Sequence, residues 1–440
     1  MKNILVLGAG KSSIVLIKYL SNLSEKFNLI IKVAALDVSY FIDNPLNNVL
    51  PIELNINNDD QLNKNIMDSY LVVSMLPSFM HFKIAKICSN IGKNLITASY
   101  LTPEIKKLNS NFLKRNTFLM MEMGLDPGID HMSAMKIIHK LENNYELKSF
   151  ESYTGGLLTP NSKSYNPWNY KFTWNPKNVV LAGSQGATYF KNNKEVKLSY
   201  DEIFNKINLV QIPKLGVFEG YANRDSMKYI DIYNLKNIKT IFRGTLRNRG
   251  FCSAWNLLIK LGLTDDKTII HKPFNMTHGN FSRSKVFQNQ KGEIKELLSS
   301  KFNVKKNSLE IKCLDWLELF SDKLIGTKNG TYADILLDIL SKKWKIKKNE
   351  TDRVIMVHRF KYLKNKRVKN LISYFYIDGK DEIETAMAQT VGLPIGIFIK
   401  LFLMNKINLK GIHLPINEEI YNPILNELNT IGINFKEVIY

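Results

Sequence analysis

The stretch NILVLGAGKSS, residues 3–13, decides the fold of the N-terminal part of this chain. Four apolar residues precede Gly8-Ala9-Gly10, and apolar side chains then recur at helical spacing over residues 12–23. A strand, a glycine turn and a helix in this order predict a phosphate site: Gly8 permits the tight turn, and Gly10 lets a pyrophosphate approach the helix N-terminus. Ser13 stands where the third glycine of this pattern usually lies.

Strands and helices alternate through the first hundred residues. Apolar runs predict strands at 3–7, 29–36, 52–56, 70–76 and 94–98, with helices at 12–23 and 80–91. Such alternation indicates βαβ units with right-handed crossovers. We therefore expect an α/β fold whose N-terminal part is a Rossmann-type, doubly wound parallel sheet.

The pattern changes at about residue 145. Alternating aromatic and polar residues predict strands of a second, antiparallel-type sheet at 149–153, 170–174, 229–233, 355–362 and 371–377. Residues 250–340 are mostly helical in pattern, and a helix at 384–402, a last helix and a strand at 436–439 follow. A chain of 440 residues accommodates two or three domains.

The formal charge of +21 raises the question of nucleic-acid binding. The lysines are spread along the chain together with abundant Asn and Ile, and all three share A/T-rich codons, so genome composition explains the excess. We expect no nucleic-acid partner, although a surplus of positive charge can draw in an acidic substrate.

Cysteine usage and hydropathy indicate the compartment. Cys88, Cys252 and Cys313 are scattered and lack metal-ligand spacing, so neither disulfides nor a metal site are expected. We see no signal peptide and no apolar run of the roughly 20 residues that cross a bilayer. We expect a cytoplasmic protein with no membrane partner.

A second informative stretch is MEMGLDPGIDHMSAMK, residues 121–136. Pro127 reads as a first helical residue and Asp126 as its cap, and the polar pair Asp130-His131 follows. Such a junction suits negative charge and proton transfer, because backbone N–H groups and titratable side chains meet there. A well-capped helix start without chemistry is the alternative.

The string GLDPGIDH at 124–131, with YTGGL at 153–157, resembles the L-glutamate-forming saccharopine dehydrogenases. Further strings resemble that family in the same order: LGAGKSS at 7–13, SMLPSFMH at 74–81, ITASYLTPE at 96–104, NPWNYKFTWNP at 166–176, NRDS at 223–226, RGTLRNRGF at 243–251, DWLELFSDK at 315–323 and AMAQTVGLPIG at 386–396. The resemblance implies a Rossmann domain (1–130, completed by about 390–440), an α+β substrate and dimerisation domain (131–249 and about 341–389), a small helical insertion (250–340) and a homodimer.

The resemblance implies a nicotinamide dinucleotide, and we expect NAD, with NADP possible. Asp37 ends the second strand, where a carboxylate usually binds the ribose 2′-OH and repels a 2′-phosphate. Relatives that use NADP tend to carry an arginine near this point, whereas this chain reads Ala35-Leu36-Asp37. A plain turn former is the alternative for Asp37. The candidate cofactor-binding residues are Gly8, Ala9, Gly10, Lys11, Ser12, Asp37, Asn55, Met75, Leu76, Pro77, Thr97, Ala98 and His131.

The implied reaction removes a hydride from the carbon beside the secondary amine of saccharopine and hydrolyses the imine to glutamate and 2-aminoadipate 6-semialdehyde, or runs in reverse. Three substrate carboxylates need forked cations, for which the candidates are Arg224 and Arg247. Ser99, Tyr100, Asp126, Thr245 and Leu246 complete the candidate substrate site, and the candidate proton handlers are Asp126, His131 and Tyr100, with Lys171 weaker.

Several alternatives stay open at this point. Asp126 is alternatively a cap and a partner of the substrate amine, His131 a cofactor contact, and either arginine a surface ion pair. For the whole chain, the alternatives are a related dehydrogenase that acts on a carboxylated polyamine and a non-catalytic dinucleotide-binding scaffold.

Overall fold

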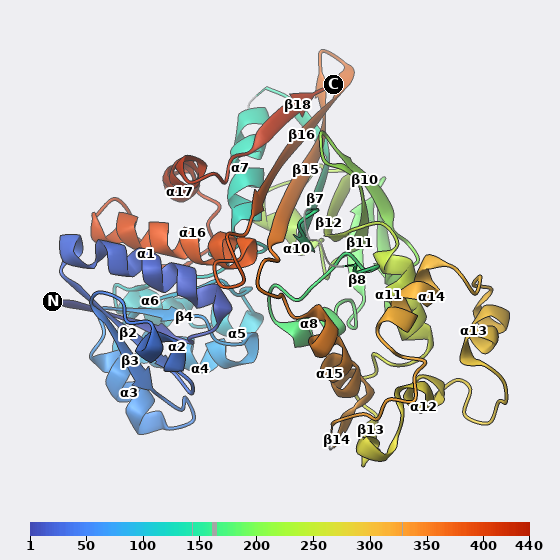
Figure 1. Cartoon of the computed structure of the whole chain (residues 1–440). Helices are drawn as coiled ribbons and strands as arrows, with labels where there is room; N and C mark the ends of the chain where they lie inside the picture. Colours follow the sequence, from blue (N-terminus) through green and yellow to red (C-terminus); the bar gives the residue numbers. More distant parts are fainter. Residues whose placement is uncertain (143, 161–164, 328) are drawn as a thin grey trace. The chain divides into compact units, whose positions relative to one another are not determined.

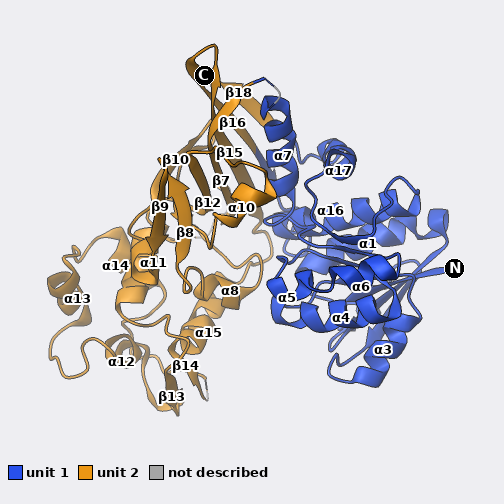
Figure 2. Ribbon diagram, turned by 180° about the vertical axis from the view of Figure 1, so that it is seen from behind, with its two compact units in different colours: residues 1–144, 375–435 blue, residues 145–374, 436–440 orange. Residues whose placement is uncertain are grey.

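A computed structural model describes residues 1–142, 144–160, 165–327 and 329–440 (Figure 1). The chain divides into two compact units: residues 1–144 with 375–435, and residues 145–374 with 436–440 (Figure 2). The first unit extends past the expected boundary at 130 because α7 (Ile129–Glu142) packs against α17 (Glu418–Thr430). The last strand, which we expected in the nucleotide-binding domain, belongs to the second unit.

The first unit contains the predicted parallel sheet, with the strand order β17-β6-β5-β4-β1-β2-β3. Pairing runs in parallel register from Lys2↔Leu29 on one side of β1 and from Ile4↔Leu71 on the other. Its strands are β1 (Lys2–Leu7), β2 (Leu29–Ala35), β3 (Val49–Glu53), β4 (Leu71–Ser74), β5 (Asn94–Thr97), β6 (Phe118–Met120) and β17 (Gly411–His413). This is the doubly wound sheet that the sequence predicts.

One strand of this sheet differs from its predicted position. β3 lies three residues earlier than 52–56 and includes Pro51. A proline is tolerated there because β3 is an edge strand that pairs only with β2. Leu54 and Ile56, which suggested the strand, are buried in the loop that follows it.

Helices cover both faces of the sheet. Leu5 and Leu7 pack with side chains of α3, α4 and α6, and Figure 1 shows α1 and α16 on the opposite side. The helices of this unit are α1 (Lys11–Phe27), α2 (Ser39–Asp43), α3 (Asp59–Met67), α4 (His81–Ile91), α5 (Pro103–Lys106), α6 (Asn109–Lys114), α7, α16 (Ala386–Leu403), α17 and the 3₁₀ turn η1 (Ser78–Met80).

Helix α16 is long and strongly apolar. Within the described residues it is the one helix long and apolar enough to cross a membrane, but 78% of it is buried inside the protein. It packs along α1, so its apolar surface is covered by the first unit itself. Such burial is typical of a core helix, and the composition of α16 is therefore weak evidence for a membrane span.

The second unit contains a mixed sheet with the strand order β10-β11-β12-β7-β15-β16-β18, and β8 pairs with β12 and β9. β12 and β7 pair in parallel, whereas the other neighbours are antiparallel. The strands are β7 (Glu146–Leu158), β8 (Ala187–Lys191), β9 (Lys194–Leu198), β10 (Asn208–Ile212), β11 (Gly216–Ala222), β12 (Thr240–Arg247), β15 (Asp352–Lys364), β16 (Arg367–Asp378) and β18 (Lys436–Ile439). The predicted strands at 149–153, 355–362 and 371–377 lie within β7, β15 and β16.

Two other predicted strands are wrong. Residues 229–233 fall in the short helix α10 (Lys228–Ile232), in which Tyr229 and Tyr233 lie one turn apart and are both buried. Four-residue spacing of two aromatics satisfies a strand pattern and a helix pattern equally, and here tertiary packing selects the helix. Residues 170–174 form a loop with a single bridge from Phe172 to Lys345.

The remainder of the second unit is mostly helical, as the pattern at 250–340 predicts. Its helices pack around an aromatic cluster that includes Trp168, Trp255 and Trp344. The elements are α8 (Pro176–Val180), α9 (Tyr200–Ile203), α10, α11 (Phe251–Lys260), α12 (His278–Arg283), α13 (Ile294–Phe302), α14 (Leu309–Trp316), α15 (Tyr332–Trp344), the 3₁₀ turn η2 (Pro273–Asn275) and the small sheet of β13 (Ile269–His271) and β14 (Asn329–Thr331).

Candidate functional site

The glycine turn after β1 lies where the strand order of the parallel sheet reverses, between β1 and β4. Gly8 has a φ of +107°, and a Cβ there would lie 3.1 Å from the carbonyl oxygen of Met75. Gly10 caps α1, no described side chain caps its first turn, and a Cβ at Gly10 would meet nothing within 4 Å. The backbone is therefore open at Gly10, at the N-terminus of a 17-residue helix, which fits an anionic pyrophosphate.

Ser13 replaces the third glycine without loss of close packing. Its side chain is buried, and its Oγ donates to the carbonyl oxygen of Gly10 at 2.6 Å. The hydroxyl thus ties the glycine turn to the first turn of α1, so the departure from the glycine pattern is compatible with the same loop.

The structure brings the candidate cofactor residues other than His131 to the carboxyl edge of the parallel sheet, where open α/β sheets bind ligands. They lie at the end of strands β1 to β5, in the segments that follow these strands, or in the first turn of α1: Gly8, Ala9, Gly10, Lys11, Ser12, Asp37, Asn55, Met75, Leu76, Pro77, Thr97 and Ala98. His131 lies instead in the first turns of α7.

Asp37 is exposed and forms a local turn. Its Oδ1 accepts from the backbone N–H of Ser39 at 2.9 Å and from the Ser39 hydroxyl at 2.6 Å. These hydrogen bonds hold the pKa of the Asp37 carboxyl below its ordinary value, so the group is charged at neutral pH. The preceding Leu36 is 72% exposed, which leaves an apolar and an acidic side chain together at the end of β2.

His81, which the sequence analysis did not single out, joins the ends of β4 and β5. Its Nδ1 is hydrogen-bonded to Ser74 Oγ at 2.9 Å, and its Nε2 to Ser99 Oγ at 2.7 Å. The ring is 2% exposed, and this burial lowers the pKa of His81 to about 4. A neutral imidazole therefore fixes the hydroxyl of the candidate substrate residue Ser99.

The GLDPG segment forms a closed turn ahead of α7. The N–H of Gly124 donates to the carbonyl oxygen of Pro127 at 3.0 Å, and a Cβ at Gly128 would lie 2.0 Å from the carbonyl oxygen of Gly124. Helix α7 begins at Ile129, so Pro127 lies in the turn and is not its first residue. Asp130 bonds the local backbone, accepting from the N–H of Gly128 at 2.6 Å.

Asp126 and Tyr100 are brought together by this turn. The Tyr100 hydroxyl donates to Asp126 Oδ1 at 3.1 Å, and both side chains are half-buried. A phenol that bonds a carboxylate at the rim of the sheet is an arrangement that can accept or pass on a proton.

His131 is completely buried, and its Nε2 lies 2.7 Å from Glu122 Oε2. Glu122 is not among the site residues that the sequence motifs predict. No local pattern identifies it, because its contacts come from the segment after β5 and from α7.

The two candidate arginines lie in the second unit. Arg247 is the last residue of β12, 3% exposed, and its guanidinium carbon lies 4.7 Å from the ring centroid of Tyr170 and 5.1 Å from that of Phe251. Its Nη1 donates to the carbonyl oxygen of Leu246, whereas its Nε has no hydrogen-bond partner among the described residues. Of its neighbours on β12, Thr245 is half-buried and Leu246 fully buried.

Arg224 follows β11, is exposed and has a φ of +55°. β11 and β12 pair through Ala222↔Gly244; Arg224 lies two residues beyond this pair and Arg247 three residues away in the opposite direction. At about 3.3 Å per residue, their backbones are roughly 17 Å apart.

Lys171, the weaker proton-handler candidate, is in a buried ion pair with Glu350 and also donates to the carbonyl oxygen of Lys345 at 3.2 Å. Both partners are at least nine-tenths buried. These contacts join the 170–174 loop to the segment after α15, which is a structural role.

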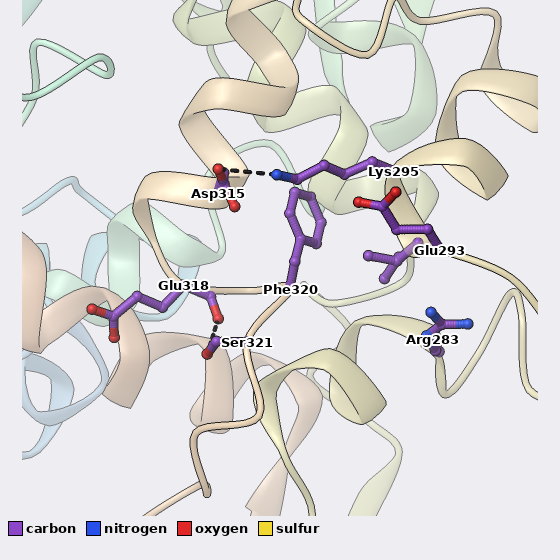
Figure 3. A pocket seen from close by; sticks show the side chains of 8 residues that line it. Arg283, Glu293, Lys295, Asp315, Glu318, Phe320 and Ser321 are labelled. Carbon is purple, nitrogen blue, oxygen red and sulfur yellow. Dashed lines mark hydrogen bonds and ion pairs between the residues drawn. The ribbon is translucent and has the colours of Figure 1, made fainter.

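A separate cavity of about 370 Å³ lies among α12, α13 and α14 (Figure 3). Its charged groups are already engaged: Lys295 Nζ lies 3.2 Å from Asp315 Oδ2, and the Arg283 guanidinium donates to the carbonyl oxygens of Gln290 and Gly292. No group of three or more His, Cys, Asp or Glu side chains that could hold a metal ion occurs among the described residues.

Comparison with known proteins identifies the family. A model described as the saccharopine dehydrogenase NADP binding domain matches residues 4–120, and one described as the saccharopine dehydrogenase C-terminal domain matches residues 124–433. The chain belongs to the saccharopine dehydrogenase family. Residues 4–120 are accordingly a nicotinamide dinucleotide-binding domain, and the open glycine turn at the N-terminus of α1 fits that assignment.

Relatives of the saccharopine dehydrogenase family cover the whole chain. It is 31% identical over 448 residues to the saccharopine dehydrogenase [NADP(+), L-glutamate-forming] of Saccharomyces cerevisiae, covering 99% of both chains. It is 34% identical over 400 residues to the mitochondrial alpha-aminoadipic semialdehyde synthase of Rattus norvegicus, and there it spans only 41% of the longer protein. The apo structure of the L-Glu forming saccharopine dehydrogenase from Saccharomyces cerevisiae superposes with a TM-score of 0.88 at 29% identity over all of both chains.

Proposed function

We propose that this protein catalyses the nicotinamide-dependent oxidation of saccharopine to L-glutamate and 2-aminoadipate 6-semialdehyde, or the reverse reaction. The observation that carries the proposal is Arg247, a buried cation that lies among Tyr170, Tyr221 and Phe251 and whose Nε has no acceptor in the part of the chain that the structure describes. A buried donor without a partner is costly, and a substrate carboxylate is the ligand that would satisfy it.

A nicotinamide dinucleotide held at the glycine turn of Gly8 and Gly10 would supply the acceptor for the hydride from the carbon beside the substrate's secondary amine. The chain's own residues orient the substrate and move protons. Asp126 accepts the proton that the amine loses, Tyr100 fixes the Asp126 carboxylate through its hydroxyl, and the arginines bind the terminal carboxylates. Water then adds to the imine carbon, the C–N bond breaks, and the amine leaves as glutamate.

The buried position of His131 favours Asp126 and Tyr100 for this proton transfer. The roughly 17 Å between the arginine backbones is compatible with a long substrate that carries carboxylates at both ends. Saccharopine has this shape.

The test is the production of reduced nicotinamide, followed by absorbance, with saccharopine as the substrate. A polyamine that has a secondary amine and no carboxylate is the matched control and should give no turnover. Turnover of the polyamine instead of saccharopine would reject the proposed substrate, and no turnover of either would reject the proposed reaction.

We further propose that the enzyme prefers NAD to NADP, although the names of the fungal relatives specify NADP(+). The charged Asp37 and the apolar Leu36 at the end of β2 support this, because a 2′-phosphate would meet a carboxylate and no arginine. We expect kcat/KM for NAD to exceed that for NADP by about tenfold or more. Asp37→Ser should lower this preference for NAD. A tenfold preference for NADP in the wild type would contradict this role of Asp37.

For its assembly and compartment we propose a cytoplasmic homodimer. The three cysteines are buried and outside disulfides, which suits a reducing compartment. Light scattering coupled to gel filtration gives the mass of the assembly, and a monomer at micromolar concentration would reject the dimer.

A further inference from the structure

Glu122 is a fully buried carboxylate in the middle of the candidate site. It follows β6, is 1% exposed and has a φ of +58°, a conformation that residues other than glycine rarely adopt. A buried carboxylate is unfavourable unless its oxygens accept hydrogen bonds. The partners of Glu122 therefore indicate its role.

The main chain and the side chain of Glu122 form hydrogen bonds to the two residues that flank Tyr100. The N–H of Glu122 donates to the carbonyl oxygen of Ser99 at 3.1 Å, and its Oε1 accepts from the N–H of Leu101 at 2.9 Å. The backbone on each side of Tyr100 is thus fixed by one residue. The Tyr100 hydroxyl, in turn, donates to Asp126.

The second carboxylate oxygen, Oε2, holds Nε2 of His131 at 2.7 Å. His131 is in the first turn of α7, so this contact joins the two ends of the segment 122–131, in which Asp126 lies. One carboxylate therefore links the Tyr100 segment to the helix behind the Asp126 turn.

We propose that Glu122 is a positioning residue, which sets the contact between Tyr100 and Asp126 and thereby the proton transfer of the reaction. This inference rests on the proposed function. The structure requires Glu122 to accept at both oxygens, one from a backbone N–H and one at the His131 ring. A glutamine at this position presents an N–H₂ group to one of those partners, and an aspartate is one methylene too short to reach both.

The test combines Glu122→Gln with Tyr100→Phe in a double-mutant cycle of saccharopine oxidation. If Glu122 acts through Tyr100, Glu122→Gln lowers kcat by about tenfold or more and shifts the pH profile of kcat, while the KM for saccharopine and the Kd of the cofactor change by less than about twofold. In the Tyr100→Phe background the same substitution changes kcat by less than about twofold.

Two further variants separate positioning from folding. Glu122→Asp keeps the buried charge and is expected to lower kcat as well, so the proposal stays testable if Glu122→Gln does not fold. Glu427→Gln, the control, removes the negative charge from the ion pair of Glu427 with Lys400 in the same unit; it should lower the unfolding temperature and leave the pH profile unchanged.

An unchanged kcat in folded Glu122 variants, or equal effects of Glu122→Gln in both backgrounds, would overturn this role while leaving the proposed function in place. A wild-type protein that does not turn over saccharopine would overturn the proposed function, and this role with it.

Discussion

At the scale of single residues, the site depends on buried polar side chains that bridge strand ends. His81 is one of them: its ring joins Ser74, the last residue of β4, to Ser99 after β5 and is neutral because it is buried. Burial makes protonation of His81 unfavourable, so acid acts differently on the folded and unfolded chain. The unfolded chain binds a proton at His81 below its ordinary pKa of 6.5, whereas the folded protein does so only near pH 4.

We therefore predict that His81 makes the protein less stable as the pH falls from about 6.5 toward 4. The free energy of unfolding should drop by about 2 kcal/mol between pH 7 and pH 5 on account of this residue. His81→Gln should lose that part of the pH dependence, and the exposed control His271→Gln should retain it. Urea unfolding at pH 7 and pH 5 measures the free energy of unfolding of each variant. An equal drop in this free energy in wild type and His81→Gln would contradict the prediction.

The two candidate arginines are also tested one residue at a time. If Arg224 and Arg247 bind carboxylates, replacing either with Ala should raise the KM for saccharopine and leave cofactor affinity nearly unchanged. The expected loss of transition-state stabilisation is about 2–4 kcal/mol, and Lys should recover only part of it because a point charge cannot replace the fork.

The matched control for the arginines is Arg283→Ala, which removes a guanidinium that bonds loop carbonyls in the helical region. An unchanged saccharopine KM in both Ala variants, with the fold intact, would remove the two arginines from the site.

At the scale of elements, the packing of α16 on α1 supports the glycine turn. A Cβ on Gly392 of α16 would lie 2.9 Å from the backbone nitrogen of Leu16 and 3.2 Å from the carbonyl oxygen of Ser12. Ser12 is in the first turn of α1, which fits the cofactor pyrophosphate. The spacing of these two helices thus reaches the cofactor site.

We predict that Gly392→Ala destabilises the protein by about 1–2 kcal/mol, because overpacking against a backbone outweighs the gain in helix propensity. It should also weaken cofactor binding, since α1 must shift. Thermal unfolding and fluorescence titration test both effects. The control is Gly326→Ala, whose Cβ would approach only the end of Lys342 at 3.6 Å; equal behaviour of the two variants would contradict the prediction.

Some elements of the fold could be predicted from the sequence and others could not. The parallel sheet was predictable because β1, β2, β4 and β5 are mostly apolar and because Gly8 follows β1, Pro77 follows β4 and Gly92 precedes β5. β11 was not, because its two glycines lower strand propensity and its stability comes from pairing with β10 and β12. The site residues of the motifs were predictable, whereas Glu122 and His81 act through contacts with residues distant in sequence, which no local pattern encodes.

At the scale of the whole molecule, the charge of +21 is the property with the widest consequences. We predict that it does not make the protein a nucleic-acid binder. Fluorescence anisotropy with duplex DNA or RNA at about 150 mM salt should show only weak binding that is independent of sequence and declines steeply as salt rises. Tight and selective binding under these conditions would contradict the prediction.

The division of the chain into units also bears on its synthesis. The chain leaves the first unit after residue 144, returns to it at 375, and leaves it again at 435 for the strand β18. A ribosome therefore produces most of the cofactor-binding unit first, but delivers α16, α17 and β17 only after nearly all of the second unit. Until β17 and α16 have been synthesised, the edge strand β6 of the nascent parallel sheet has no partner and the face of α1 that packs against α16 is exposed. We therefore expect the N-terminal segment to be prone to aggregation until the last quarter of the chain has been synthesised.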